Sequence, residues 1–126
     1  MELISTEPVI IVDIARHRFR IHRTTLERLG KPDYVRLLIN PDKKGLVVAS
    51  CNEDTQGAHR LRHPSKRHST EVYSPSLVNE LAKCAGFAHQ KAVRLTGRQL
   101  RGQQVIFFSL ENAGDADERT GVDANE

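Results

Sequence analysis

Short β-prone runs, helix-start signals and turn residues follow one another in the same order twice along this chain. In the first half, an alternating run ending at Ile21 leads to a short helical stretch and then to a hairpin over residues 34–49. In the second half, a run over 70–73 leads to a helix and to runs over 91–96 and 104–110. One such unit has too little apolar surface to bury alone, whereas two units can close one core. The sequence therefore predicts an α+β fold: two strand–helix–hairpin units (a pseudo-repeat) packed into one small domain, mainly antiparallel β with two short helices.

Local signals mark the ends of these elements. Thr24 and Glu27 have capping-box spacing, and Gly30 is a natural stop for the first helix. Ser74 and Pro75 provide an N-cap and a first helical residue for the second helix. Residues 9–15 predict a strand, and the alternation over 16–21 predicts a second strand or a continuation of the first through a bend. Residues 97–103 are expected to form a polar connection.

Charge divides the chain into a basic body and an acidic tail. The net charge is +3, yet 18 of the 19 Lys and Arg residues and only 10 of the 16 acids lie before residue 111. We expect residues 1–113 to form a single α+β domain with units over 9–50 and 58–113. Residues 114–126 are predicted to be an acidic disordered tail. A body with a net charge of +8 attracts polyanions, and nucleic acid is the most common one.

Two clusters of basic residues are the candidate binding site. In an extended segment, Arg16, Arg18 and Arg20 project from one face about 6.6 Å apart. A guanidinium is a permanently charged planar donor that engages phosphate in a bidentate manner or reads guanine. The predicted nucleic-acid-binding residues are Arg16, Arg18, Arg20 and Arg23 in the first cluster and Arg60, Arg62, Lys66 and Arg67 in the second. They predict a regulatory protein that binds nucleic acid, with double-stranded DNA as the expected form.

The first half also carries a recognisable succession of a short strand, a helix ending in Leu-Gly, a turn with Pro and Asp, and a Val-rich hairpin. These features are Phe19-Arg20-Ile21, Leu26, Leu29-Gly30, Pro32-Asp33, Val35 and Leu46-Val47-Val48. The pattern resembles the swapped-hairpin transcription regulators of the AbrB/MraZ type over about 32 residues. His22-Arg23 stands where that family has a Pro, and the second half lacks the Leu-Gly and the Pro/Asp turn. The resemblance implies a transcription regulator that dimerises or uses a pseudo-dimer and contacts DNA through Arg18, Arg20 and Arg23.

A protein-binding function is the alternative. A small phage- or mobile-element-type inhibitor that binds a host protein or nucleoprotein complex would share the size and the charged surface. In such a protein the acidic tail would mimic nucleic acid on the target, whereas in a DNA-binding protein it would compete for the basic surface. The sequence leaves open both these roles and the choice between a monomer and a homodimer.

Enzymatic and metal-binding functions find little support. The chain has no nucleophile-elbow, phosphate-loop or zinc-protease motif, so we expect no catalytic residues and no cofactor. Cys51, His59, His63 and His68 share one polar stretch, but their spacing does not match a zinc site, and no metal is expected. The chain shows neither an apolar run of membrane-spanning length nor a signal peptide. Cys51 and Cys84 are expected to be reduced thiols of a cytoplasmic protein, with Cys84 a small core residue.

Overall fold

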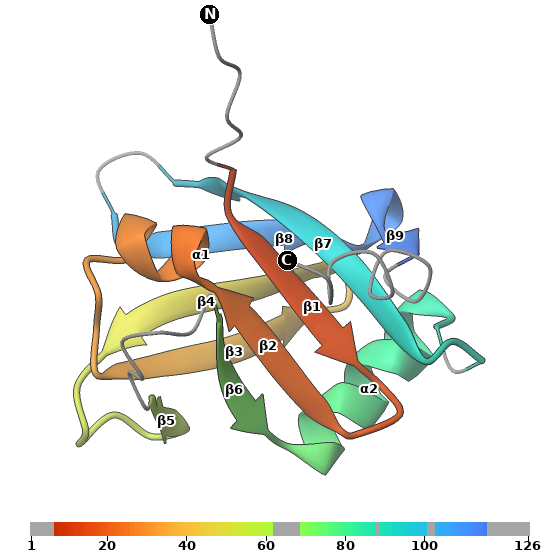
Figure 1. Cartoon of the computed structure of the whole chain (residues 1–126), viewed down its shortest axis with the longest axis horizontal. Coiled ribbons are helices and arrows are strands. Elements are labelled where there is room, and N and C mark those ends of the chain that lie inside the picture. Colours follow the sequence, from red (N-terminus) through yellow and green to blue (C-terminus); the bar gives the residue numbers. More distant parts are fainter. Residues whose placement is uncertain (1–6, 62–68, 88, 101–102, 116–126) are drawn as a thin grey trace, which may run out of the picture.

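A computed structural model of the chain describes residues 7–61, 69–87, 89–100 and 103–115. The described residues form one antiparallel sheet that curves into a nearly closed, barrel-like shape with two α-helices (Figure 1). The strands are β1 (Val9–Asp13), β2 (Arg18–His22), β3 (Tyr34–Asn40), β4 (Gly45–Cys51), β5 (Ala58–Arg60), β6 (Ser69–Tyr73), β7 (Ala92–Gln99), β8 (Val105–Ser109) and β9 (Gly114–Asp115). The helices are α1 (Arg23–Arg28), α2 (Pro75–Ala85) and the 3-10 turn η1 (Leu110–Asn112).

The strands pair in an order that differs from their order along the chain. Neighbours in the sheet run β5-β3-β4-β8-β7-β1-β2-β6, and β9 pairs with β7. Side chains alternate between the interior and the outer surface, as expected for strands that cover a core on one face. Phe19 and Ile21 of β2 are completely buried, whereas their neighbours Arg18 and Arg20 are partly exposed. On β2 the inward side chains are therefore apolar, and the outward side chains are polar.

Strand β7 joins the two parts of the sheet. Its residues 92–96 pair with β1, and its residues 97–99 pair with β8. The change of partner occurs at Gly97, where an added Cβ would lie 2.7 Å from both Ile106 Cγ2 and the Phe108 ring. Because both of those side chains are completely buried, only a glycine allows β7 to approach them so closely. The bend at Gly97 thus lets one strand continue around the barrel.

The two α-helices lie at opposite ends of the barrel (Figure 1). α1 follows β2 directly, and α2 begins one residue after β6. Since β2 and β6 are antiparallel neighbours, their carboxyl ends point in opposite directions. α1 buries Leu26 and packs with Leu29 against the core, while α2 buries Val78 and Leu81. Each helix therefore covers one open end of the interior.

The prediction of two strand–helix–hairpin units is wrong. Strands of the two halves alternate in the sheet, because β1 and β2 pair with β7 and β6, and β4 pairs with β8. The two supposed hairpins also differ: β3 and β4 pair over seven residues, whereas β7 and β8 pair over three. Neither half therefore buries a core of its own, and the molecule is an antiparallel barrel-like sheet with two helices rather than a pseudo-repeat.

Several element boundaries also differ from those expected. The N-cap of α1 is His22, whose Nδ1 accepts a hydrogen bond from the Thr24 backbone N–H, so Thr24 lies inside the helix. Strand β7 continues to Gln99, into the stretch expected to be a polar connection. Gly114 and Asp115, the first two residues of the expected tail, pair with β7, and residues 116–126 lie outside the described residues.

Candidate nucleic-acid interface

The outward side chains of four neighbouring strands and the β1–β2 turn gather four arginines and two acids on one surface. Strands β6, β2, β1 and β7 lie side by side on the near side of the molecule in Figure 1. We use the name arginine face for one residue of the β1–β2 turn and seven of the outward residues of these strands: Ile11, Asp13, Arg16, Arg18, Arg20, Glu71, Tyr73 and Arg94. The strand registers fix which of these residues are neighbours.

Two rows of residues cross the arginine face. In one row Glu71 lies opposite Arg20, Arg20 opposite Ile11, and Ile11 opposite Arg94. In the next row Tyr73 lies opposite Arg18, and Arg18 opposite Asp13. Adjacent strands are about 4.8 Å apart, so each row brings side chains from distant parts of the sequence within contact distance.

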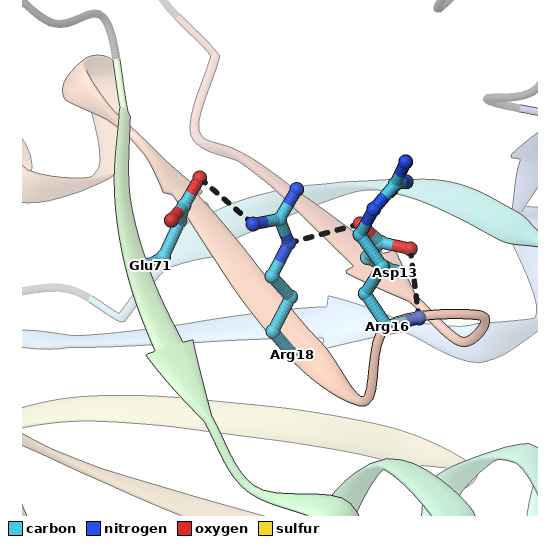
Figure 2. A network of polar contacts seen from close by, with 4 residues as sticks. All are labelled: Asp13, Arg16, Arg18 and Glu71. Atoms are coloured by element: carbon cyan, nitrogen blue, oxygen red, sulfur yellow. Dashed lines mark hydrogen bonds and ion pairs between the residues drawn. The ribbon is translucent and has the colours of Figure 1, made fainter.

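Asp13 organises the second row. Its carboxylate accepts a hydrogen bond from Arg18 Nε at 2.9 Å and another from the Arg16 backbone N–H at 3.3 Å. Arg16 Nη1 lies 3.6 Å from the same carboxylate, and Arg18 Nη1 lies 3.2 Å from Glu71 Oε2. Figure 2 shows the Arg18 guanidinium between the two acids. Although Asp13 is on the outer surface, its side chain is only 4% exposed, because the arginines cover it.

This network divides the arginines into two kinds. The Arg18 side chain is 26% exposed and interacts with two carboxylates, so its charge is largely balanced and its guanidinium is held in one orientation. The Arg16 side chain is 70% exposed and has the longer contact to Asp13. Arg20 and Arg94 have no hydrogen-bond or ion-pair partner among the described residues. On the arginine face, Arg20 and Arg94 are therefore the cations left unpaired within the described part of the chain, and the ion-paired Arg16 is exposed enough to contact a ligand as well.

The structure brings together part of the predicted site. Arg18 and Arg20 share the outer face of β2, but Arg16 lies in the turn before that strand. Arg23 is the first residue of α1, and its Nε lies 3.7 Å from Oε2 of Glu27, one helical turn further on. Arg60 is in β5, at the opposite end of the strand order from β6. Arg62, Lys66 and Arg67 lie outside the described residues.

Sequence reasoning missed five of the eight members of the arginine face, and Asp13, Tyr73 and Arg94 are the three that matter most for its geometry. In the sequence, Asp13, Tyr73 and Arg94 stand out only as members of β-prone runs. The period-two alternation over 91–96 places Arg94 on the outward side of β7, which is a usable local signal. That Arg94 stands two strands away from Arg20 follows only from the sheet order, which no local signal reveals.

Apart from the arginine face, the surface has a cleft between α1 and the β7–β8 hairpin. It has a volume of about 730 Å³, and its walls include Glu7, Glu27, Arg28, Arg98 and the side chain of Gln99. Gln99 Nε2 donates to the backbone oxygens of Arg28 and Gln103 and so closes one wall. Two acids and two arginines balance the charge of this cleft. It therefore lacks the excess of positive charge that favours a polyanion.

Of the four residues weighed as metal ligands, the structure describes Cys51 and His59. Cys51 is a free thiol at the end of β4, and His59 is on β5, where burial lowers the pKa of its imidazole. His63 and His68 lie outside the described residues. Cys84 is also free and packs against the core from α2, as expected. Within the described part of the chain, no three potential ligand side chains are grouped to hold a metal ion.

Comparison with known proteins adds no relative. The sequence matches no protein-family model, and searches of curated proteins and of solved structures give no similar chain. The resemblance to AbrB/MraZ-type regulators therefore remains a prediction from apolar spacing. In the part of the chain that the structure describes, neither α1 nor α2 has the length and apolar character needed to cross a membrane.

Proposed function

We propose that the protein binds nucleic acid through the arginine face. The observation that carries this proposal is the grouping on one outer surface of Arg20 and Arg94, which have no ion-pair partner among the described residues, with the highly exposed Arg16. The face carries four arginines and two acids, so its charge is +2 with the ion pairs included. Guanidinium groups spaced along a smooth β surface suit a chain of phosphates, which each arginine contacts independently of base sequence.

The sequence expectations favour a cytoplasmic regulatory protein. The basic clusters and the family resemblance favour duplex DNA as its ligand. The free thiols of Cys51 and Cys84 support a reducing compartment. An inhibitor that binds a host protein would not need unpaired arginines in one row of the sheet, as Arg20 and Arg94 are. Measuring the binding of nucleic acid directly therefore separates the two functions.

The test reverses the charges of Arg20 and Arg94 and leaves the contacts of Asp13 unchanged. In R20E/R94E the net charge changes from +3 to −1, and the control K43E/K83E changes it by the same amount at exposed positions outside the arginine face. Binding of a 20-base-pair duplex is measured by fluorescence anisotropy at 50, 100 and 200 mM salt. We expect R20E/R94E to lose at least about tenfold in affinity and to lower the salt slope by about 2, one unit for each phosphate contact removed.

The control separates a local site from the overall charge. K43E/K83E should keep its salt slope and most of its affinity, and thermal unfolding should report a folded protein for both variants. R20Q/R94Q, which avoids placing a second carboxylate opposite Glu71, should show a smaller loss in the same direction. Equal losses in R20E/R94E and K43E/K83E would reject the arginine face as the binding site.

A further inference from the structure

Tyr73 is the aromatic residue of the arginine face, and phosphate binding does not use it. It is the last residue of β6, and 70% of its surface is exposed. The core aromatics Phe19 and Phe108 are completely buried. A ring left this open adds little to the core, whereas tyrosine is enriched at interfaces, where its apolar ring and its polar hydroxyl both find partners.

The neighbours of Tyr73 are charged rather than apolar. Across the strand pair it faces Arg18, so their Cβ atoms are about 5 Å apart. Arg18 is held by Asp13 and Glu71, so the residue across from Tyr73 is a cation with a fixed position. Tyr73 therefore lies at the border of a positively charged surface, with no apolar side chain directly across from it on β2. An apolar protein partner would meet these charges, whereas a nucleobase offers a flat face for the ring while its phosphates meet the arginines.

We infer that Tyr73 stacks on an unpaired base, and that the protein prefers a single strand, or a strand with unpaired bases, to a fully paired duplex. This inference rests on the proposed nucleic-acid binding, and it replaces the duplex form favoured by the sequence expectations with a single-stranded one. In a duplex the faces of the bases are covered by their neighbours, so an aromatic side chain on a rigid strand reaches them only after unstacking. In a single strand every base has an accessible face, and stacking on an aromatic side chain adds affinity with little dependence on sequence.

Binding of labelled 20-nucleotide oligo-dT and of a 20-base-pair duplex is compared for the wild type, Y73A, Y73F and L38A. L38A removes another exposed apolar side chain, 41% exposed on β3, and serves as the matched control. We expect Y73A to weaken oligo-dT binding by roughly five- to 150-fold, the range for loss of one stacked base. Y73F, which keeps the ring, and L38A should bind as the wild type does, and Y73A should bind duplex with less than about a twofold change.

Tyrosine fluorescence provides a readout that does not depend on affinity. The protein has no Trp and two Tyr, so Y34F leaves Tyr73 as the only fluorescent tyrosine. In Y34F, oligo-dT should quench this fluorescence, whereas inorganic polyphosphate, which has charge without bases, should bind without quenching.

The outcomes distinguish the two proposals. If the wild type binds duplex as tightly as oligo-dT and Y73A changes neither, the stacking inference is wrong while phosphate binding stands. If polyphosphate quenches as strongly as oligo-dT, the signal reflects charge and the inference is again wrong. If the wild type binds none of the three polyanions, both proposals fail.

Discussion

Asp13 points away from the core, yet only 3% of the residue is exposed, because Arg16 and Arg18 contact its carboxylate. A carboxylate this covered depends on its partners, since a buried charge without hydrogen bonds is costly. The same acid fixes the arginine that stands beside Tyr73. The arrangement of the arginine face at the scale of single residues therefore depends on an acidic side chain.

Substituting Asp13 with Asn tests this role. The variant D13N keeps the shape of the side chain but leaves the partly buried Arg18 with a single carboxylate, Glu71. We expect the free energy of unfolding, measured by urea denaturation, to fall by about 1.5–3 kcal/mol, the usual contribution of a hydrogen bond to a charged group. The matched variant E71Q should cost less than about 1 kcal/mol, because the Glu71 side chain is 42% exposed. Equal losses in the two variants would mean that the burial of Asp13 has no energetic consequence.

At the scale of elements, local signals were sufficient for most strands and for both helices. Alternation and turn residues predicted β3, β4, β6 and β8, and Ser74-Pro75 predicted the start of α2. The β1–β2 turn was not located, because residues 14–17 contain no Gly, Pro or Asn. His17 instead adopts a left-handed conformation with φ of 56°, which a non-glycine residue takes up rarely. The register that pairs Asp13 with Arg18 depends on this turn, so the ion pair was unpredictable as well.

The continuation of β7 beyond Thr96 was also missed, because Gly97 reads as a stop signal. In the structure it is the point at which β7 changes partner from β1 to β8. We expect G97A to lower the free energy of unfolding by about 1–3 kcal/mol, since the added methyl would overlap the buried Ile106 and Phe108. The control G114A should change stability by less than about 0.5 kcal/mol, because its Cβ would meet only the Arg94 backbone oxygen, at 3.9 Å. Thermal or urea unfolding measures both, and a G97A protein as stable as the wild type would show that the bend does not need a glycine.

At the scale of the whole molecule, the order of the strands could not be derived from the sequence. Ile10 pairs with Leu95, Phe19 with Val72, and Val48 with Ile106, and no local pattern records such distant partners. The similar order of elements in the two halves favoured a repeat, whereas the shared core required the halves to alternate in one sheet. The candidate site was predicted in part for the same reason: Arg18 and Arg20 are neighbours in sequence, but Arg94 and Tyr73 join them only through the sheet.

Part of the outer surface of the barrel is apolar. On the strands away from the arginine face, the outward neighbours Leu38, Val47 and Phe107 form an apolar row across β3, β4 and β8. The arginine face attracts a polyanion more strongly than this apolar row does, and the acidic residues 116–126 act against the attraction through their charge. Their net charge is −3, from four acids and Arg119.

Truncation after Asp115 keeps β9 paired with β7 and changes the net charge from +3 to +6. We expect nucleic acid to bind on the order of two- to tenfold more tightly at 50 mM salt, and the gain to shrink at 200 mM salt as screening increases. A full-length variant with the four acids replaced by their amides should match the truncated protein if charge alone is responsible. If instead the acidic residues occupy the arginines themselves, truncation should also steepen the salt slope, because more phosphate contacts form. A fall in affinity after truncation would contradict competition, and a truncated protein that binds no nucleic acid at either salt concentration would favour a protein target on which the acidic segment acts as a nucleic-acid mimic.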